Sequence, residues 1–174
     1  KRELGITDII KLASNENPLG PSPLALVALE RAVREVHLYP DGAAYELKNR
    51  LAARHGVRPD QIVLGAGSDE VMRLLAEAYF NQGDEVIVAD PTFSQYEFVA
   101  RIMGAVVVRV PNVNHTLDLE AMAGYVTPRT RAIFVCNPNN PTGTAVGDSE
   151  VRALLEAVPQ SVLVVLDEAY HEYV

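Results

Sequence analysis

Hydrophobic and polar positions follow two alternating patterns along most of the chain. Segments with apolar residues three or four positions apart predict helices, which cover residues 23–36, 44–55, 68–80, 93–103, 118–125 and 148–157. Short continuous apolar runs between them predict strands, which cover residues 61–64, 85–89, 105–110, 131–135 and 162–166. This alternation predicts an α/β fold with a mostly parallel sheet.

Several of the predicted strands are apolar along their whole length, as residues 162–166 (Val-Leu-Val-Val-Leu) illustrate. A strand of this kind is buried on both faces, so we expect helices on both sides of the sheet. Residues 10–23 are instead rich in Pro, Asn, Ser and Gly, which is typical of an extended arm. Ligands of open α/β sheets bind beyond the carboxyl ends of the strands, and the candidate motifs follow predicted strands.

Composition narrows the partners of this chain. Its 174 residues carry a formal net charge of -8, and no cluster of Lys and Arg is present that would bind a nucleic acid. No apolar run reaches the roughly 18–20 residues that span a membrane, so we expect no membrane partner. Cys136 is the single cysteine and lies in an apolar run, which indicates a small buried side chain and fits a reducing, cytoplasmic setting. The four histidines lack the spacing of metal ligands, so we expect no metal site.

A glycine-rich loop at residues 65–70 (Gly-Ala-Gly-Ser-Asp-Glu) follows a predicted strand and opens a predicted helix. Backbone N–H groups at the start of a helix bind phosphate groups well. The loop alone leaves three interpretations open, namely a dinucleotide site, a site for another phosphate, and a plain tight turn. The dinucleotide fingerprint has a third glycine where this chain has Glu70, although Asp90 ends the next strand where a ribose-binding acid is expected. An NAD-dependent dehydrogenase is therefore one hypothesis.

Polar and aromatic residues follow three of the predicted strands. Asp167 ends a fully apolar strand, where an ionised carboxylate needs either a cation, such as a ligand's protonated ring nitrogen, or a structural role as a helix cap. Tyr170 follows three residues later and would lie beside the same ligand. Phe93 is either a stacking surface for an aromatic cofactor or an ordinary core residue. Prolines and a glycine in residues 138–143 fix a loop that presents the amide of Asn140.

Six motifs occur in a fixed order along almost the whole chain. They are Ala-Ser-Asn-Glu-Asn-Pro-Leu-Gly-Pro at 13–21, Tyr-Pro-Asp-Gly at 39–42, Gly-Ser-Asp-Glu at 67–70, Pro-Thr-Phe at 91–93, Asn-Asn-Pro-Thr-Gly at 139–143 and Asp-Glu-Ala-Tyr at 167–170. In these motifs the chain resembles the histidinol-phosphate aminotransferases, which use pyridoxal 5'-phosphate (PLP). The last three motifs are shared with many aminotransferases of the same fold, whereas the first two favour the histidinol-phosphate branch.

The resemblance implies contacts to the cofactor at several positions. Backbone N–H groups of Ser68 and Asp69 would hold the PLP phosphate. Phe93 would stack on the pyridine ring, where relatives often have Tyr. Asn140 and Tyr170 would donate hydrogen bonds to the ring oxygen.

The resemblance also implies catalytic, substrate and subunit contacts. Asp167 would pair with the protonated pyridine nitrogen, so Asp167 and Tyr170 are the expected catalytic residues. Tyr39 would reach the cofactor phosphate of a partner subunit, which implies a homodimer. Asn15 and Asn17 would lie on the arm that closes over the substrate.

The activity that the resemblance implies is transfer of an amino group between histidinol phosphate and 2-oxoglutarate, which yields glutamate and belongs to histidine biosynthesis. Residues 1–40 would form the arm and first helix, and residues 41–174 the first part of the PLP-binding large domain. The Schiff-base lysine of the family would lie beyond residue 174, so we expect the chain alone to be inactive; its own lysines precede the glycine loop and are Lys1, Lys11 and Lys48. An aromatic-amino-acid aminotransferase and a PLP decarboxylase of the same fold are the alternatives.

Overall fold

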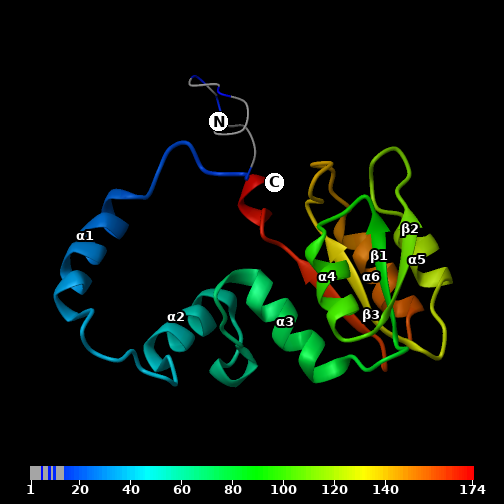
Figure 1. Ribbon diagram of the computed structural model, residues 1–174, viewed down its shortest axis with the longest axis horizontal. Coiled ribbons are helices and arrows are strands. Elements are labelled where there is room, and N and C mark those ends of the chain that lie inside the picture. The colour runs from blue at the N-terminus through cyan, green and yellow to red at the C-terminus, as the bar shows by residue number, and fades with distance from the viewer. Residues whose placement is uncertain (1–4, 6–7, 9, 11–13) are drawn as a thin grey trace. The chain divides into compact units, whose positions relative to one another are not determined.

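The computed structural model describes Gly5, Asp8, Ile10 and residues 14–174. Figure 1 labels its α-helices and strands β1, β2 and β3. The chain divides into two compact units, Lys1–Pro59 and Asp60–Val174. The domain boundary that the sequence suggests after residue 40 refers to a longer protein and stays a prediction.

From residue 14 onward, the first unit contains an irregular segment followed by two α-helices and a short 3-10 turn. The helical elements are α1 (Pro23–Ala32), η1 (Val33–Glu35) and α2 (Tyr45–His55). The hydroxyl of Ser22 accepts a hydrogen bond from the N–H of Ala25 at 3.2 Å and begins α1, with Pro23 at its first position. Gly56 ends α2 with a φ of 66°, which glycine adopts without strain. Both helices lie where the sequence predicts them.

The second unit alternates helices with strands. Its elements are α3 (Gly67–Tyr79), β1 (Glu85–Asp90), α4 (Gln95–Ile102), β2 (Val106–Pro111), α5 (Leu119–Gly124), β3 (Thr130–Cys136), α6 (Asp148–Ala157), β4 (Leu163–Asp167) and the 3-10 turn η3 (His171–Tyr173). All but η3 correspond to predicted helices and strands, with small shifts at their ends. The predicted α/β class is confirmed.

The predicted strand at residues 61–64 is wrong. The 3-10 turn η2 (Pro59–Gln61) covers its start, and the residues that follow pair with no strand in the described part of the chain. Val63 is 68% exposed, whereas Ile62 and Leu64 are partly buried, so the run has one partly buried face without being part of the sheet. A strand is stabilised by backbone hydrogen bonds to a neighbouring strand, and a four-residue apolar pattern does not show whether that neighbour exists.

The four strands of the sheet are all parallel and lie in the order β2-β1-β3-β4. The chain runs from β1 outward to β2 and then returns to the other side of β1 to form β3, so the strand order reverses between β1 and β3. Such a reversal opens a crevice at the carboxyl ends of the two strands, where ligands of open α/β sheets bind. At the same edge, Cys136 at the end of β3 pairs with Asp167 at the end of β4.

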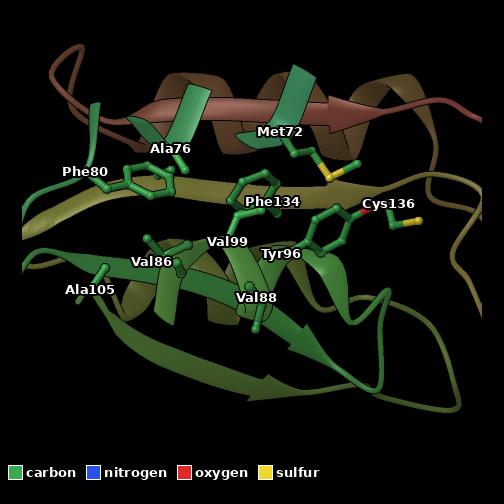
Figure 2. Packing of buried hydrophobic residues seen from close by; sticks show 12 residues of the cluster. Met72, Ala76, Phe80, Val86, Val88, Tyr96, Val99, Ala105, Phe134 and Cys136 are labelled. Atoms are coloured by element: carbon green, nitrogen blue, oxygen red, sulfur yellow. The ribbon is translucent and has the colours of Figure 1, made fainter. Parts of the chain in front are cut away.

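Helices cover both faces of the central strands, as the apolar strands predict. On one face, α3 and α4 pack against alternate residues of β1 and β3, which include Val86, Val88 and Phe134. Figure 2 shows this cluster, with Met72 and Ala76 of α3 above Phe134. On the other face, α5 and α6 pack against the intervening residues, which include Ile87 and Ile133. The division follows from the strand geometry, because successive side chains of a strand point to opposite faces.

The outer strands are less buried than the central ones. Leu166 in β4 is 38% exposed, whereas Ile133 in β3 is 0% exposed. The apolar run of β4 is therefore only partly buried, because no strand of the described residues pairs with its outer edge. Among the helices that the structure describes, none combines the length and the apolar character needed to cross a bilayer.

Candidate active site

A small cavity lies beyond the carboxyl ends of β1, β3 and β4. The residues that line it are Ser68, Phe93, Cys136, Asn140, Asp167, Ala169 and Tyr170. Most of the cofactor residues predicted from the sequence thus come together in one place, although they belong to four separate segments of the chain. The cavity has a volume of about 60 Å³.

Asp167 supplies the charge of this cavity. The residue is 9% exposed, and each of its carboxylate oxygens accepts one hydrogen bond. The hydroxyl of Tyr96 donates to Oδ2 at 2.7 Å, and the N–H of Ala169 donates to Oδ1 at 3.1 Å. None of the ion pairs found among the described residues includes Asp167. A buried carboxylate held by two donors, with no cation of this part of the chain beside it, is suited to pair with a cationic ligand.

Phe93, which lines the cavity, belongs to a group of three packed aromatic rings. The rings of Phe93 and Tyr96 meet edge to face, with centroids 5.7 Å apart and planes at 84°. The ring of Tyr96 stacks on Phe134 with a centroid distance of 4.7 Å and an interplanar angle of 11°. Phe93 both lines the cavity and packs against the core cluster, so it contributes to the core, whereas its role as a stacking surface for a cofactor stays a prediction.

Cys136 ends β3 within the cavity wall. The residue is 2% exposed, and its thiol donates to the carbonyl oxygen of Pro138 at 3.4 Å. Burial raises the pKa of the Cys136 thiol, which keeps it uncharged at neutral pH. The small buried cysteine that the sequence predicts is confirmed.

Asn139 fixes the loop that carries Asn140. Its side chain is 2% exposed, and its Oδ1 accepts a hydrogen bond from the hydroxyl of Thr92 at 2.7 Å. Its amide nitrogen donates to the carbonyl of Pro91 at 3.1 Å and to the hydroxyl of Thr142 at 2.8 Å. Asn139 therefore ties the loop after β3 to the loop after β1 and fixes the position of the neighbouring residue.

Asn140 and Tyr170 lie side by side at the cavity. The amide nitrogen of Asn140 donates to the hydroxyl of Tyr170 over a long distance of 3.4 Å. Both residues are partly buried and come from loops that follow different strands, β3 and β4. An amide and a phenol placed in this way can both donate to one ligand oxygen, as the sequence resemblance implies.

The glycine loop turns into α3 next to the cavity. Gly67 begins the helix with a φ of 76°, and the carboxylate of Glu70 accepts a hydrogen bond from the N–H of Ala66 at 2.5 Å. Ser68 in the first turn lines the cavity. The side chain of Asp69 lies instead in a separate groove between α3 and α4, so only its backbone N–H is a candidate for the predicted contact, which stays a prediction.

The other predicted site residues belong to the first unit of the chain. Tyr39 is fully exposed. The side-chain oxygen of Asn17 accepts a hydrogen bond from the N–H of Leu19 at 3.0 Å, and Asn15 has a φ of 47°. The roles assigned to these three residues, toward a partner subunit and a substrate, stay predictions.

Sequence reasoning missed Tyr96 and the structural role of Asn139. Tyr96 occupies an ordinary buried position in the pattern of its helix, and its contact with Asp167 joins residues 71 positions apart. Its spacing from Phe93 was the available signal, because side chains three positions apart share a helix face. Burial of Asn139 has no such signal, since it depends on the loop after β1.

The cavity is small for a ligand-binding site. Its volume of about 60 Å³ is far below the roughly 300–1,000 Å³ of typical ligand pockets. The wall presents a buried carboxylate, an aromatic ring, a paired amide and phenol, and the start of a helix. These groups suit a flat aromatic ligand that carries a positive ring nitrogen and a phosphate.

The sequence as a whole matches the family described as aminotransferase class I and II over residues 7–174. The chain belongs to this family. Histidinol-phosphate aminotransferases are among the relatives. The enzyme of Moorella thermoacetica is 59% identical over the whole of this chain, and the match covers 45% of that relative. The enzyme of Symbiobacterium thermophilum is 51% identical over 99% of this chain, and the match covers 48% of that relative. The resemblance noted in the sequence is thereby confirmed, and the chain spans less than half the length of these relatives.

Solved aminotransferases share the fold. The histidinol-phosphate aminotransferase of Sinorhizobium meliloti in complex with pyridoxal-5'-phosphate matches with a TM-score of 0.88 at 29% identity, over 91% of this chain and 44% of that one. A double mutant of Thermus thermophilus aspartate aminotransferase matches with a TM-score of 0.87, also at 29% identity, over 97% of this chain and 47% of that one. These matches favour an aminotransferase over the dehydrogenase suggested by the glycine loop and Asp90.

Proposed function

We propose that the full-length protein is a PLP-dependent enzyme that transfers an amino group between histidinol phosphate and 2-oxoglutarate. The observation that carries the proposal is the buried Asp167 carboxylate beside Phe93, Asn140 and Tyr170 in one cavity wall. The names of the relatives support the substrate, and the PLP complex of the Sinorhizobium protein supports the cofactor.

The cavity residues fit the chemistry of this cofactor. Bound PLP supplies a protonated pyridine ring that withdraws electrons from the α-carbon of an amino acid. Asp167 would stabilise the positive charge on the ring nitrogen, because its carboxylate is buried and lines the same cavity as Phe93 and Tyr170. Phe93 would cover one face of the ring.

Two further contacts would orient the ring and its phosphate. The amide of Asn140 and the phenol of Tyr170 would donate to the ring oxygen. The N–H groups of Ser68 and Asp69 at the start of α3 would bind the phosphate, where the helix dipole favours negative charge.

The remaining parts of the site would come from sequence outside residues 1–174 and from a second subunit. The Schiff-base lysine and the arginines for the substrate would follow Val174 in the full-length protein. Tyr39 of a second copy would reach the phosphate, so we propose a homodimer; the cytoplasmic location likewise stays a proposal.

Substrate assays on the full-length protein test the function. We expect visible absorbance from bound PLP and formation of glutamate from 2-oxoglutarate when histidinol phosphate is the amino donor. Phenylalanine and threonine phosphate are assayed in parallel. Preferred turnover of phenylalanine would indicate an aromatic-amino-acid aminotransferase, and preferred turnover of threonine phosphate would indicate a decarboxylase of the same fold. Tight binding of NADH without binding of PLP would overturn the proposal.

A further inference from the structure

Tyr96 is the buried partner of the key carboxylate and has no role in the scheme above. It lies in the first turn of α4 and is 0% exposed. Its hydroxyl donates to Oδ2 of Asp167 at 2.7 Å, across the sheet's carboxyl edge. A phenol buried in an apolar cluster needs a hydrogen-bond partner. The partner of the Tyr96 hydroxyl is Asp167, which lines the cavity.

The ring of Tyr96 is held so firmly that its hydroxyl has a fixed direction. Phe134 stacks against one face of the ring, and Phe93 meets it edge to face. Figure 2 shows Tyr96 within the cluster, with its hydroxyl oxygen next to Cys136. A rigid donor of this kind fixes the position of the acceptor.

The protonation states around the hydroxyl keep it a donor. Burial raises the pKa of Tyr96 far above its usual range, and the hydrogen bonds with Cys136 and Asp167 raise it further. The thiol of Cys136 is uncharged as well, because burial raises its pKa. In this contact the Tyr96 hydroxyl is therefore the donor and the Asp167 carboxylate is the acceptor.

The two donors on Asp167 occupy different oxygens. Tyr96 binds Oδ2 and the N–H of Ala169 binds Oδ1, which together fix the plane of the carboxylate. A carboxylate offers about four lone-pair sites, so each oxygen keeps one for a ligand. The Ala169 donor comes from the backbone of the same strand end, whereas Tyr96 is the donor that a side-chain substitution can remove.

We propose that Tyr96 is a positioning residue for the reaction, whose hydroxyl holds the Asp167 carboxylate in the orientation that pairs with the cofactor's ring nitrogen. This inference rests on the proposed function. Phe93 packs against the ring of Tyr96, so Tyr96 contacts both Phe93 and the Asp167 carboxylate. The two groups proposed to contact the cofactor ring would therefore both depend on the buried side chain of Tyr96.

The variant Tyr96→Phe tests the inference in the full-length protein, because it removes one oxygen and keeps the ring packed. We expect kcat to fall roughly tenfold to a hundredfold, as for other hydrogen bonds to charged groups, with a smaller change in KM. NMR of PLP labelled at its ring nitrogen gives a second readout. The pH at which that nitrogen loses its proton should fall by about one unit. This shift corresponds to roughly a tenfold effect, the lower end of the range expected for kcat.

Two comparisons separate positioning from a general effect on the fold. Tyr125→Phe removes the same atom from a tyrosine that is 49% exposed and should leave kcat and the NMR titration unchanged. In a background of Asp167→Asn, Tyr96→Phe should cost much less than it does in the wild type, because the charge that it positions is gone.

The outcomes divide clearly between the two proposals. Wild-type protein that binds no PLP would overturn the proposed function and this inference with it. Wild-type protein that binds PLP and turns over, while Tyr96→Phe keeps the wild-type kcat and the wild-type titration of the ring nitrogen, would overturn this inference alone. Equal losses from Tyr96→Phe with and without Asp167→Asn would also overturn it, since the hydroxyl would then act elsewhere.

Discussion

Replacing Asp167 by Asn isolates the charge that the proposed mechanism requires. The variant keeps the size of the side chain and both of its local contacts. The new amide oxygen can still accept the N–H of Ala169, and the new amide nitrogen can face Tyr96, whose hydroxyl accepts as well as donates. We therefore expect the fold to survive, and the only lost interaction is the ion pair with the cofactor's ring nitrogen.

The size of the effect follows from the burial of the carboxylate. At the 9% exposure of Asp167, an effective dielectric constant near 20 is appropriate, and two unit charges about 4 Å apart then attract by about 4 kcal/mol. Losing that stabilisation in the transition state lowers kcat about a thousandfold. The affinity for PLP should fall much less, because the phosphate, the stacking surface and the ring oxygen keep their proposed partners.

Steady-state kinetics with histidinol phosphate measure kcat. A titration of PLP against the protein freed of cofactor measures the affinity for PLP. Glu168→Gln is the matched control, since Glu168 is the adjacent acid, is exposed and forms no ion pair among those found in the described residues. It should leave kcat unchanged. A kcat for Asp167→Asn within about threefold of the wild type would amount to less than 1 kcal/mol and would refute the assigned role.

Three further predictions concern the scaffold around the site. Asn139→Ala removes a buried side chain with three hydrogen bonds and should lower the free energy of unfolding by about 2 kcal/mol in urea titrations; an unchanged midpoint would contradict its bracing role. Gly67→Ala should cost about 1 kcal/mol, because alanine is strained at a φ of 76° although no atom lies near the added Cβ; equal stability would argue against that backbone conformation. Hydrogen bonds from Thr127 and Arg129 lower the pKa of the buried Glu85, so its stabilising effect is present above about pH 4.5 and lost as the pH falls through the lowered value. Melting temperatures of wild type and Glu85→Gln should therefore differ at pH 7 and converge in acid, whereas a constant difference would contradict the assignment.

The fold was predictable where local pattern and tertiary packing agree. The apolar runs of β1 and β3 are buried on both faces, and side chains such as Ile87 and Phe134 pack under helices on opposite sides. The run at residues 61–64 shows where this reasoning fails. Its pattern resembles a strand, but a strand exists only if another strand lies alongside, and that depends on the whole chain.

The sequence by itself determined the family and most of the cavity residues. The motifs around Phe93, Asn140 and Asp167 each follow a strand, and parallel strands bring their carboxyl ends to the same edge of a sheet. The chemistry of those residue types could therefore be read from their order along the chain.

Only the tertiary structure decided how the Asp167 carboxylate is held. Tyr96 contacts Asp167 and Asn139 contacts Thr92, both on other segments of the chain. The spacing of Phe93 and Tyr96 indicates only that their side chains share a face, and no spacing indicates the contact of Asn139. Hydrogen bonds between distant side chains depend on how helices pack against the sheet, which periodicity does not specify. For this reason the sequence identified the charged residue of the candidate site, Asp167, whereas its contact with Tyr96 could be identified only from the structure.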